Sequence, residues 1–217
     1  EDVEYPGTID WKEFIASEPL DKMAELDIKN DVALLQYTSG TTGNPKGAMI
    51  THLNIMANAT SAPMSVNATA EDVYLTVLPL FHVTGMTNSM NAPVYLGSTM
   101  ILIARFDAET LLMAIAKYKC SVWLAITTMN IAVINHPNLK NYDISSLRAL
   151  ISGGAPVPPV VVEKYRSMTG CNLVEGFGMS ETISATILNP LERNKLGSIG
   201  VPMVAVDIRV ADLKDET

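Results

Sequence analysis

The chain has 217 residues, of which 48% are hydrophobic and 18% are charged, and its formal net charge is -8 at pH 7. This length is enough for one large domain with a real core, and the negative charge argues against a nucleic-acid surface, which would need a basic stripe. The sequence has no apolar run of about 18 residues and no signal-peptide pattern, so we expect no membrane span, and two cysteines without metal-ligand spacing, Cys120 and Cys171, favour reduced thiols and a cytoplasmic protein.

Residues 1–31 predict little regular structure. Asp10 and Glu13 precede Phe14 and Ile15, which is a capping-box pattern for a short helix. Residues 18–31 are charged and irregular, and we expect them to connect into the domain. The apolar runs 32–35 and 48–50 then predict two buried strands on either side of a polar loop.

The polar loop, residues 37–47 (Tyr-Thr-Ser-Gly-Thr-Thr-Gly-Asn-Pro-Lys-Gly), has the composition of an anion-binding cradle. Its glycines allow positive φ angles, its consecutive backbone N–H groups attract negative charge, and its hydroxyls and Lys46 add donors. A triphosphate would suit it. The Walker pattern fits poorly because Lys46 is followed by Gly47, which argues against a P-loop NTPase. Composition alone leaves a solvated linker as the alternative.

Beyond this loop, Thr51 can cap a helix that runs through Ile55 to about residue 60. A regular alternation of elements begins at Asp72. Strands are expected at 73–78, 99–104, 121–125, 147–151 and 172–174, and helices at 83–95, 107–118, 127–135 and 158–169. Strands separated by helices of this length form right-handed crossovers, so the sequence predicts an α/β fold with a mainly parallel sheet and helices on both faces.

Ligands of open parallel sheets bind beyond the carboxyl ends of the strands, where we expect three stretches to converge. Residues 79–82 end in His82, which is either a satisfied, partly buried side chain or a functional one. Residues 152–156 offer small residues against which a flat base could lie, or form a tight strand-to-helix turn. Residues 175–182 carry an aromatic face at Phe177, glycines that open the backbone around it, and Glu181, an oxygen ligand suited to Mg²⁺. A glycine-rich turn with a solvated Glu is the alternative there.

Residues 37–47 resemble the phosphate-binding signature of the adenylate-forming superfamily, which contains acyl-CoA synthetases, the adenylation domains of peptide synthetases and the luciferases. Residues 177–181, Phe-Gly-Met-Ser-Glu, resemble its aromatic-Gly-Met/Leu-Thr/Ser-Glu motif, with Phe where Tyr is common and Ser where Thr is common. Residues 79–82, 152–156 and 197–202 resemble three further motifs of the superfamily. The five motifs occur in the right order, and the agreement extends from about residue 34 to residue 210.

The resemblance implies an acyl-CoA ligase, closest to fatty-acid-CoA ligases. Such an enzyme uses ATP and Mg²⁺ to convert a carboxylate into acyl-AMP and pyrophosphate and then transfers the acyl group to coenzyme A. The apolar residues 183–186, and the lack of a charged group in residues 81–90 to meet an ammonium, favour a fatty acid over an amino acid. The alternatives are an amino-acid-activating adenylation domain, a nucleotide-binding module without chemistry, and a structural fragment that binds no ATP.

The resemblance also assigns roles to individual residues. Phe177 would lie against the adenine, Ser180 would contact the α-phosphate, and Glu181 with Thr38 would hold Mg²⁺. His82 would orient the substrate carboxylate or gate its tunnel, and Lys46 would add charge beside the pyrophosphate, so His82, Lys46 and Glu181 are the implied catalytic residues. The implied nucleotide-binding residues are Thr38, Ser39, Gly40, Thr41, Thr42, Gly43, Lys46, Gly154, Ala155, Pro156, Gly176, Phe177, Gly178, Met179 and Ser180.

The low charged fraction, Glu1 at the start and a polar end directly after a strand lead us to expect a piece of a longer protein. On the resemblance, residues 1–30 would connect from a missing N-terminal subdomain and residues 31–210 would form the AMP-binding α/β subdomain. Residues 211–217 would stop before a ribose motif, a hinge and a C-terminal domain. The expected partners are a small carboxylic acid, such as a fatty acid, and these missing domains of the same chain, without which the fragment should be catalytically silent or nearly so.

Overall fold

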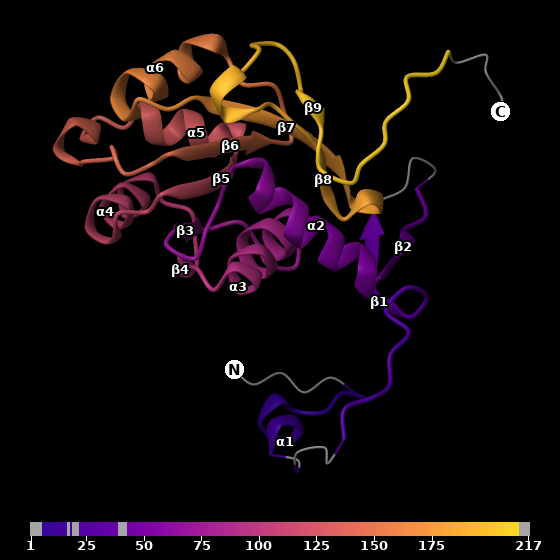
Figure 1. The fold of residues 1–217 in the computed structure, drawn as a ribbon. Coiled ribbons are helices and arrows are strands. Elements are labelled where there is room, and N and C mark those ends of the chain that lie inside the picture. The colour runs from indigo at the N-terminus through magenta and orange to yellow at the C-terminus, as the bar shows by residue number, and fades with distance from the viewer. Residues whose placement is uncertain (1–5, 17, 19–21, 39–42, 213–217) are drawn as a thin grey trace.

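The computed structural model describes residues 6–16, 18, 22–38 and 43–212 (Figure 1). The helices are α1 (Trp11–Ile15), α2 (His52–Ser65), the π-helix η1 (Gly85–Asn91), α3 (Ala92–Leu96), α4 (Ala108–Tyr118), α5 (Thr127–Ile134), the 3₁₀ turn η2 (Leu139–Asn141), α6 (Pro159–Thr169), and the 3₁₀ turns η3 (Ser180–Thr182) and η4 (Leu191–Arg193). The strands are β1 (Val32–Thr38), β2 (Lys46–Thr51), β3 (Val73–Thr76), β4 (Thr99–Leu102), β5 (Val122–Ile126), β6 (Ala149–Gly153), β7 (Leu173–Met179), β8 (Ser184–Leu188) and β9 (Val201–Pro202).

Seven strands form one sheet in the order β4-β3-β5-β6-β7-β8-β9. The five strands from β4 to β7 run parallel, and β8 and β9 extend the β7 edge as antiparallel strands. Each parallel neighbour is reached through a helical crossover, as the alternation of apolar strands and helices requires. The predicted α/β fold with a mainly parallel sheet is therefore confirmed.

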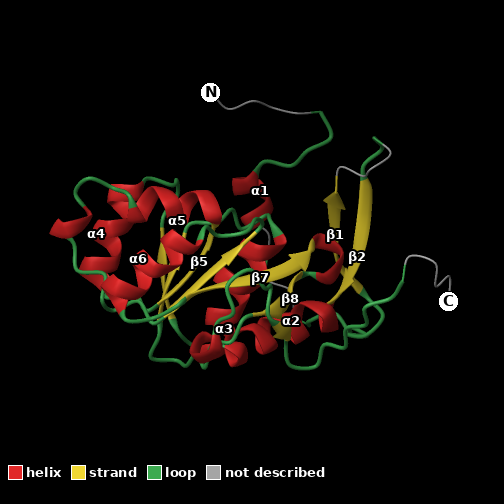
Figure 2. Ribbon diagram, turned by 90° about the horizontal axis from the view of Figure 1, so that it is seen from above, coloured by secondary structure: helices red, strands yellow, loops and turns green. Residues whose placement is uncertain are grey.

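The central parallel strands β3, β5 and β6 are largely buried on both faces because side chains alternate between two apolar layers (Figure 2). Leu75, Trp123 and Leu150 pack with residues of α4, α5 and α6 on one face. Tyr74 and Val122 pack on the other face with the end of α2, with Leu96 of α3 and with the segment that follows β9. This double burial explains why the strands are continuous apolar runs in the sequence.

The sheet differs from the prediction at its β8 edge. The strand expected at 172–174 continues to Met179 as β7, and the chain then reverses through η3 to form β8, which the sequence did not predict. The reversal places Ile183 at a φ of 54° and Ser184 at a φ of 106°. Because L-residues other than Asn and Asp rarely adopt positive φ, no local sequence signal marks this turn.

The strands beside the polar loop are not both buried, so that expectation was wrong. β1 and β2 form a separate antiparallel ribbon, whose inner residues Leu34 and Ile50 pack against Ile183. On its outer face Leu35 is 53% exposed and Met49 is 72% exposed. A two-stranded ribbon that packs on one side can bury only every second side chain, which its apolar run did not reveal.

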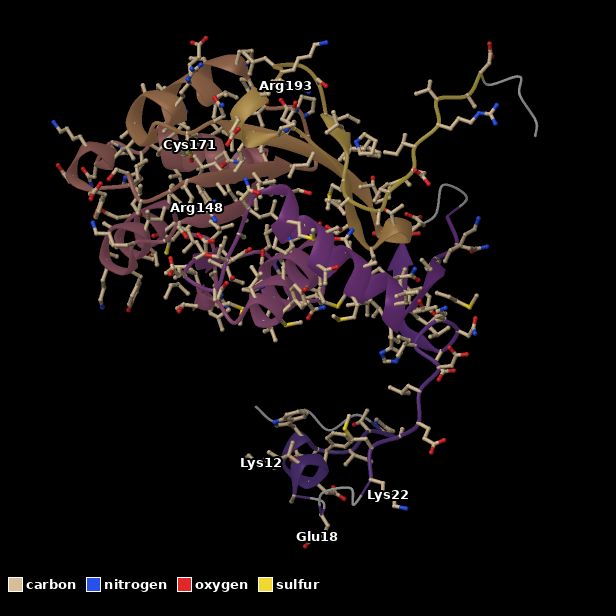
Figure 3. All side chains as sticks on the ribbon, viewed as in Figure 1. Lys12, Glu18, Lys22, Arg148, Cys171 and Arg193 are labelled. Carbon is tan, nitrogen blue, oxygen red and sulfur yellow. The ribbon has the colours of Figure 1, made fainter. Side chains whose placement is uncertain are left out.

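An ion pair ties the amino ends of three parallel strands together. Arg148, labelled in Figure 3, pairs with Asp72 and also donates to the carbonyls of Val66 and Asn67 at 3.0 Å each. Ser121 donates to the same Asp72 carboxylate at 2.7 Å. Burial opposes ionisation of Asp72, but the hydrogen bonds from Arg148 and Ser121 outweigh it and hold its pKa below the usual range.

Asp10 caps α1 as expected, accepting a hydrogen bond from the backbone N–H of Lys12 at 2.8 Å. Thr51 caps α2 through a reciprocal hydrogen-bonded pair with Asn54, and this helix runs past the expected residue 60 to Ser65. Among the helices of the described part of the chain, none combines the length and apolar character needed to cross a lipid bilayer.

Candidate functional site

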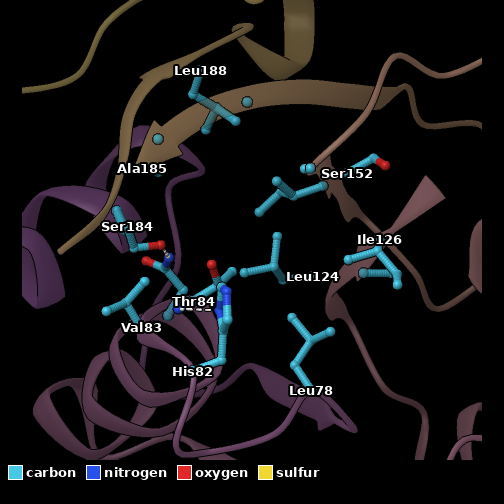
Figure 4. Close-up of a pocket in the computed structure, with 18 of the residues that line it drawn as sticks. Leu78, His82, Val83, Thr84, Leu124, Ile126, Ser152, Ser184, Ala185 and Leu188 are labelled. Atoms are coloured by element: carbon cyan, nitrogen blue, oxygen red, sulfur yellow. Dashed lines mark hydrogen bonds between the residues drawn. The ribbon is translucent and has the colours of Figure 1, made fainter. Parts of the chain in front are cut away.

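The three stretches that were expected to converge line one cavity of about 640 Å³ at the carboxyl ends of the parallel strands (Figure 4). Residues 79–82 contribute from the end of β3, residues 152–154 from the end of β6, and residues 176–180 from β7. This volume lies in the range of pockets that enclose small organic ligands. The topology therefore brings together segments that lie almost 100 residues apart, roughly as the strand-end rule requires.

The cavity is mostly apolar. Leu78, Leu124 and Ile151 project into it from the strands or their ends, and Met129 reaches it from α5. Among the described residues that line it there is no Asp, Glu, Lys or Arg. Its polar side chains are those of Tyr74, His82, Thr84, Asn88, Ser152, Ser180 and Ser184. The arrangement suits a ligand with a hydrocarbon body and few polar groups.

His82 is an exposed residue of the cavity lining, and its ring points toward the cavity centre (Figure 4). Its Nδ1 accepts a hydrogen bond from the backbone N–H of Thr84 at 3.2 Å. A neutral imidazole whose Nδ1 accepts carries its proton on Nε2. His82 can therefore present an N–H donor to a ligand oxygen.

The turn at 152–156 is held by Thr127, which the sequence reasoning missed. The Thr127 hydroxyl donates to the carbonyl of Ala155 at 2.7 Å and lies 3.3 Å from the hydroxyl of the fully buried Ser152. Gly154 lines the cavity with a φ of 83°, a conformation that favours glycine, whereas Ala155 and Pro156 do not line it. Thr127 directly follows β5, at the same strand-end edge of the sheet as the turn, and this position in the sequence could have identified it as a site residue.

Phe177 lies within β7 and is 44% exposed, so its ring is available to a ligand. The two glycines beside it make room for β8. A Cβ on Gly178 would lie 1.9 Å from the carbonyl oxygen of Ser184, and one on Gly176 would lie 3.0 Å from the side chain of Leu188. The expectation that they open the backbone around Phe177 is therefore replaced by a packing role, and nucleotide contact of Gly176, Gly178 and Met179 stays a prediction.

Glu181 lines a second, smaller cleft of about 190 Å³ between α2, η3 and residues 204–206, and does not line the large cavity. The turn η3 that carries Glu181 lies against both β1 and β2. Thr38 and Lys46 are opposite one another in register at the end of that ribbon where the phosphate loop joins its two strands. Glu181 and the described ends of the phosphate loop thus lie on the same side of the molecule.

Ser39, Gly40, Thr41 and Thr42 of the predicted phosphate loop lie outside the described residues. Gly43, which follows them, has a φ of 87° with open space where a Cβ would stand. No group of three or more His, Cys, Asp or Glu side chains gathers into a metal site among residues 6–16, 18, 22–38 and 43–212. Because Mg²⁺ in phosphate sites needs only one or two protein oxygens besides phosphates and water, the lack of a larger cluster does not conflict with such an ion, and its binding by Glu181 with Thr38 stays a prediction.

A second pair of cavity residues was also missed by the sequence reasoning. The Asn88 side-chain N–H donates to the Ser184 hydroxyl at 2.6 Å, and both residues are buried. Asn88 stands among other polar residues, Thr87, Ser89 and Asn91, so nothing in the sequence singled it out. Nothing in the sequence indicated Ser184, because the turn that presents it was not predictable.

Comparison with known proteins places the whole chain in one family. The model of the family described as "AMP-binding enzyme" matches residues 4–217. The long-chain-fatty-acid–CoA ligase of Bacillus subtilis (strain 168) is 42% identical over 190 residues, covering 86% of this chain and 34% of that protein. Feruloyl-CoA synthase of an Amycolatopsis species is 36% identical over 198 residues, covering 89% of this chain and 39% of that protein. The chain thus spans roughly a third of the length of the curated relatives it matches.

Solved structures with the same fold agree with this grouping. The long-chain-fatty-acid-CoA ligase FadD1 from Archaeoglobus fulgidus superimposes with a TM-score of 0.81 at 28% identity, covering 94% of this chain and 43% of that one. The inhibitor-bound N-terminal domain of FACL13 from Mycobacterium tuberculosis also gives a TM-score of 0.81, at 26% identity, covering 89% of this chain and 48% of that domain. The fold around the cavity is therefore shared with these proteins.

Proposed function

Because the chain belongs to the family of AMP-binding enzymes, we propose that it provides the acid- and ATP-binding centre of an acyl-CoA ligase. The reaction joins a carboxylate to the α-phosphate of ATP, releases pyrophosphate, and then passes the acyl group to coenzyme A. The observation that carries this proposal is an uncharged apolar cavity with His82 in its lining, enclosed by the three strand-end segments. The names of the relatives, a long-chain-fatty-acid–CoA ligase and a feruloyl-CoA synthase, support an organic acid as the substrate.

The cavity would bind the hydrocarbon part of the acid. Removing apolar surface from water stabilises such a complex by about 25 cal/mol per Å², so an aliphatic chain would be held mainly by the apolar wall. The carboxylate would stay near His82, whose Nε2–H can donate to one of its oxygens. A carboxylate is already ionised at neutral pH, so His82 orients it and removes no proton.

The polar side of the site would bind the nucleotide. The turn at Gly154 and the exposed ring of Phe177 offer a flat surface for adenine, and Ser180, which lines the same cavity, would contact the α-phosphate. Thr38 and Lys46, at the end of the ribbon, would meet the pyrophosphate portion. Bound Mg²⁺, held by Glu181 and Thr38, would neutralise phosphate charge during the transfer.

Two alternatives make different demands on the cavity. An amino-acid substrate would bring an ammonium, which a buried site normally pairs with a carboxylate, and the described lining contains none. A nucleotide-binding module without chemistry would need no apolar cavity beside the nucleotide. Both observations favour a simple carboxylic acid.

Titration calorimetry of the 217-residue chain tests the proposal. We expect decanoate and Mg-ATP each to bind, and decanoate to bind more tightly than 2-aminodecanoate. Lys46→Met should weaken Mg-ATP about tenfold through loss of a charged contact, whereas Lys140→Met, on η2 away from both pockets, should not. Failure of both decanoate and Mg-ATP to bind would refute the proposal, and binding of Mg-ATP alone would favour the module without chemistry.

A further inference from the structure

Ser184 is a strained, buried residue in the wall of the large cavity. It is 4% exposed and has a φ of 106°, directly after Ile183 at a φ of 54°. Non-glycine residues in such regions are strained and persist where the surrounding structure enforces them, often at ligand sites. Here the enforcement is close contact, since the Ser184 carbonyl oxygen fills the position of the missing Gly178 Cβ.

The strained conformation directs a hydroxyl into an apolar space. In Figure 4 the Ser184 oxygen points toward the interior of the cavity, and a dashed line marks its hydrogen bond. That bond is donated by the Asn88 amide, so the Ser184 oxygen is the acceptor and its own proton remains to be donated. No acceptor for this proton occurs among the interactions of the described residues.

The Asn88 side chain also has an unpaired polar atom. It is 9% exposed, and its Oδ1 is enclosed without a hydrogen-bond partner in the described part of the chain. Buried polar atoms are almost always paired, and an unpaired one destabilises the fold. Within the described residues, the pair therefore leaves three groups unpaired, namely the Asn88 Oδ1, the second Asn88 N–H and the Ser184 O–H. Ser184 lines the cavity, so a ligand hydroxyl oxygen can accept from its O–H, whereas a methylene cannot.

The oxygen that completes the pair differs from the carboxylate of the substrate. His82, the proposed carboxylate contact, is an exposed residue, whereas Asn88 and Ser184 are buried. The pair thus lies farther from solvent than the group that meets the nucleotide. A carboxylate at His82 would leave the rest of the acid to pass beside the pair.

We infer that Ser184, oriented by Asn88, selects acids that carry a hydroxyl substituent on the acyl chain over unsubstituted acids of the same length. This inference rests on the proposed function, because it assumes that the cavity binds the acyl group. Ser184 is the specificity-determining residue, and Asn88 is a positioning residue that acts through it. A plain alkyl chain would leave the Ser184 proton unpaired in an apolar wall.

The test compares decanoate with hydroxydecanoates that carry the hydroxyl on the second, third or fourth carbon. Affinities are measured by titration calorimetry on the wild-type chain. We expect at least one hydroxydecanoate to bind about fivefold more tightly than decanoate, the factor that one net hydrogen bond supplies. Equal binding of decanoate and all three hydroxydecanoates would overturn the inference and leave the proposed function standing, because water would then complete the pair. Failure of every acid to bind would refute the proposed function and the inference together.

Variants then locate the preference. Ser184→Ala should abolish the preference for the hydroxy acid, and Asn88→Ala should reduce the preference. Ser61→Ala, a serine of similar burial on α2 outside the large cavity, should preserve it. If Ser184→Ala retains the preference, the inference is wrong. It is also wrong if this variant weakens the binding of decanoate and of hydroxydecanoate equally, because Ser184 would then contact the carboxylate that both acids share. The wild-type comparison needs no variant and remains decisive if Ser184→Ala does not fold.

Discussion

Thr127→Val tests whether the turn at 152–156 is held from α5. The substitution keeps the shape of the side chain and removes the hydroxyl that donates to Ala155 and lies 3.3 Å from Ser152. Ala155 is exposed, so water can replace the hydroxyl at its carbonyl, whereas Ser152 is fully buried and would lose its side-chain partner. An unpaired buried polar group costs about 1–3 kcal/mol of stability. Because only the Ser152 hydroxyl would be left unpaired, we expect Thr127→Val to lower the free energy of unfolding by about 1–2 kcal/mol.

For a domain of this size, each kcal/mol lowers Tm by about 2–4 °C, so the expected shift is about 2–8 °C. Thermal unfolding followed by circular dichroism measures it. Mg-ATP affinity should also fall, because the turn that carries Gly154 is no longer fixed. The control is Thr60→Val, whose hydroxyl bonds only to the carbonyls of Met56 and Ala57 in its own helix. If Thr127→Val and Thr60→Val have the same Tm, the Thr127 hydrogen bonds do not hold the turn. A lower Tm of Thr127→Val without weaker Mg-ATP binding would refute the role of the turn in nucleotide binding.

Two further substitutions test the packing around the site. Gly178→Ala would place its Cβ 1.9 Å from the Ser184 carbonyl oxygen and should lower the free energy of unfolding, measured in urea, by about 3 kcal/mol or more. The control is Gly153→Ala, whose Cβ would lie 3.8 Å from the nearest atom and should not destabilise the fold. Similar urea midpoints for the two variants would contradict the β7–β8 geometry. Arg148→Met leaves Asp72 without its cation and should cost about 2–4 kcal/mol at pH 7. Because the folded-state pKa of Asp72 is lowered, this stabilisation is present above its unfolded pKa of about 3.9 and lost as pH falls through the folded value. The gap between wild type and Arg148→Met should therefore narrow below about pH 4, and a gap that does not change with pH would refute the pairing.

The parallel part of the sheet was predictable because its strands are continuous apolar runs separated by capped helices. Asp107, for example, accepts from the backbone N–H of Thr110 at 2.8 Å at the expected start of α4. The strand-end rule then located His82, Gly154 and Phe177 around one cavity, although no single one of these residues indicated a site on its own.

The features that were missed depend on tertiary contacts. β8 requires a reversal in which Ile183 and Ser184 hold positive φ angles, and neither residue type signals that conformation. The exposed outer face of the β1–β2 ribbon follows from the lack of a second packing layer in the described structure, which the apolar run did not reveal. Thr127 and the Asn88–Ser184 pair act through hydrogen bonds between segments distant in sequence, so only the folded chain brings them together.

The most direct test of the account is the structure of the chain with an acyl-sulfamoyl-adenosine, a stable mimic of acyl-AMP. The account predicts that the alkyl chain fills the large cavity, that the acyl–sulfamate junction lies between His82 and Ser180, and that the adenine lies between the Gly154 turn and Phe177. An alkyl chain outside the cavity, or an adenine remote from Phe177, would contradict it.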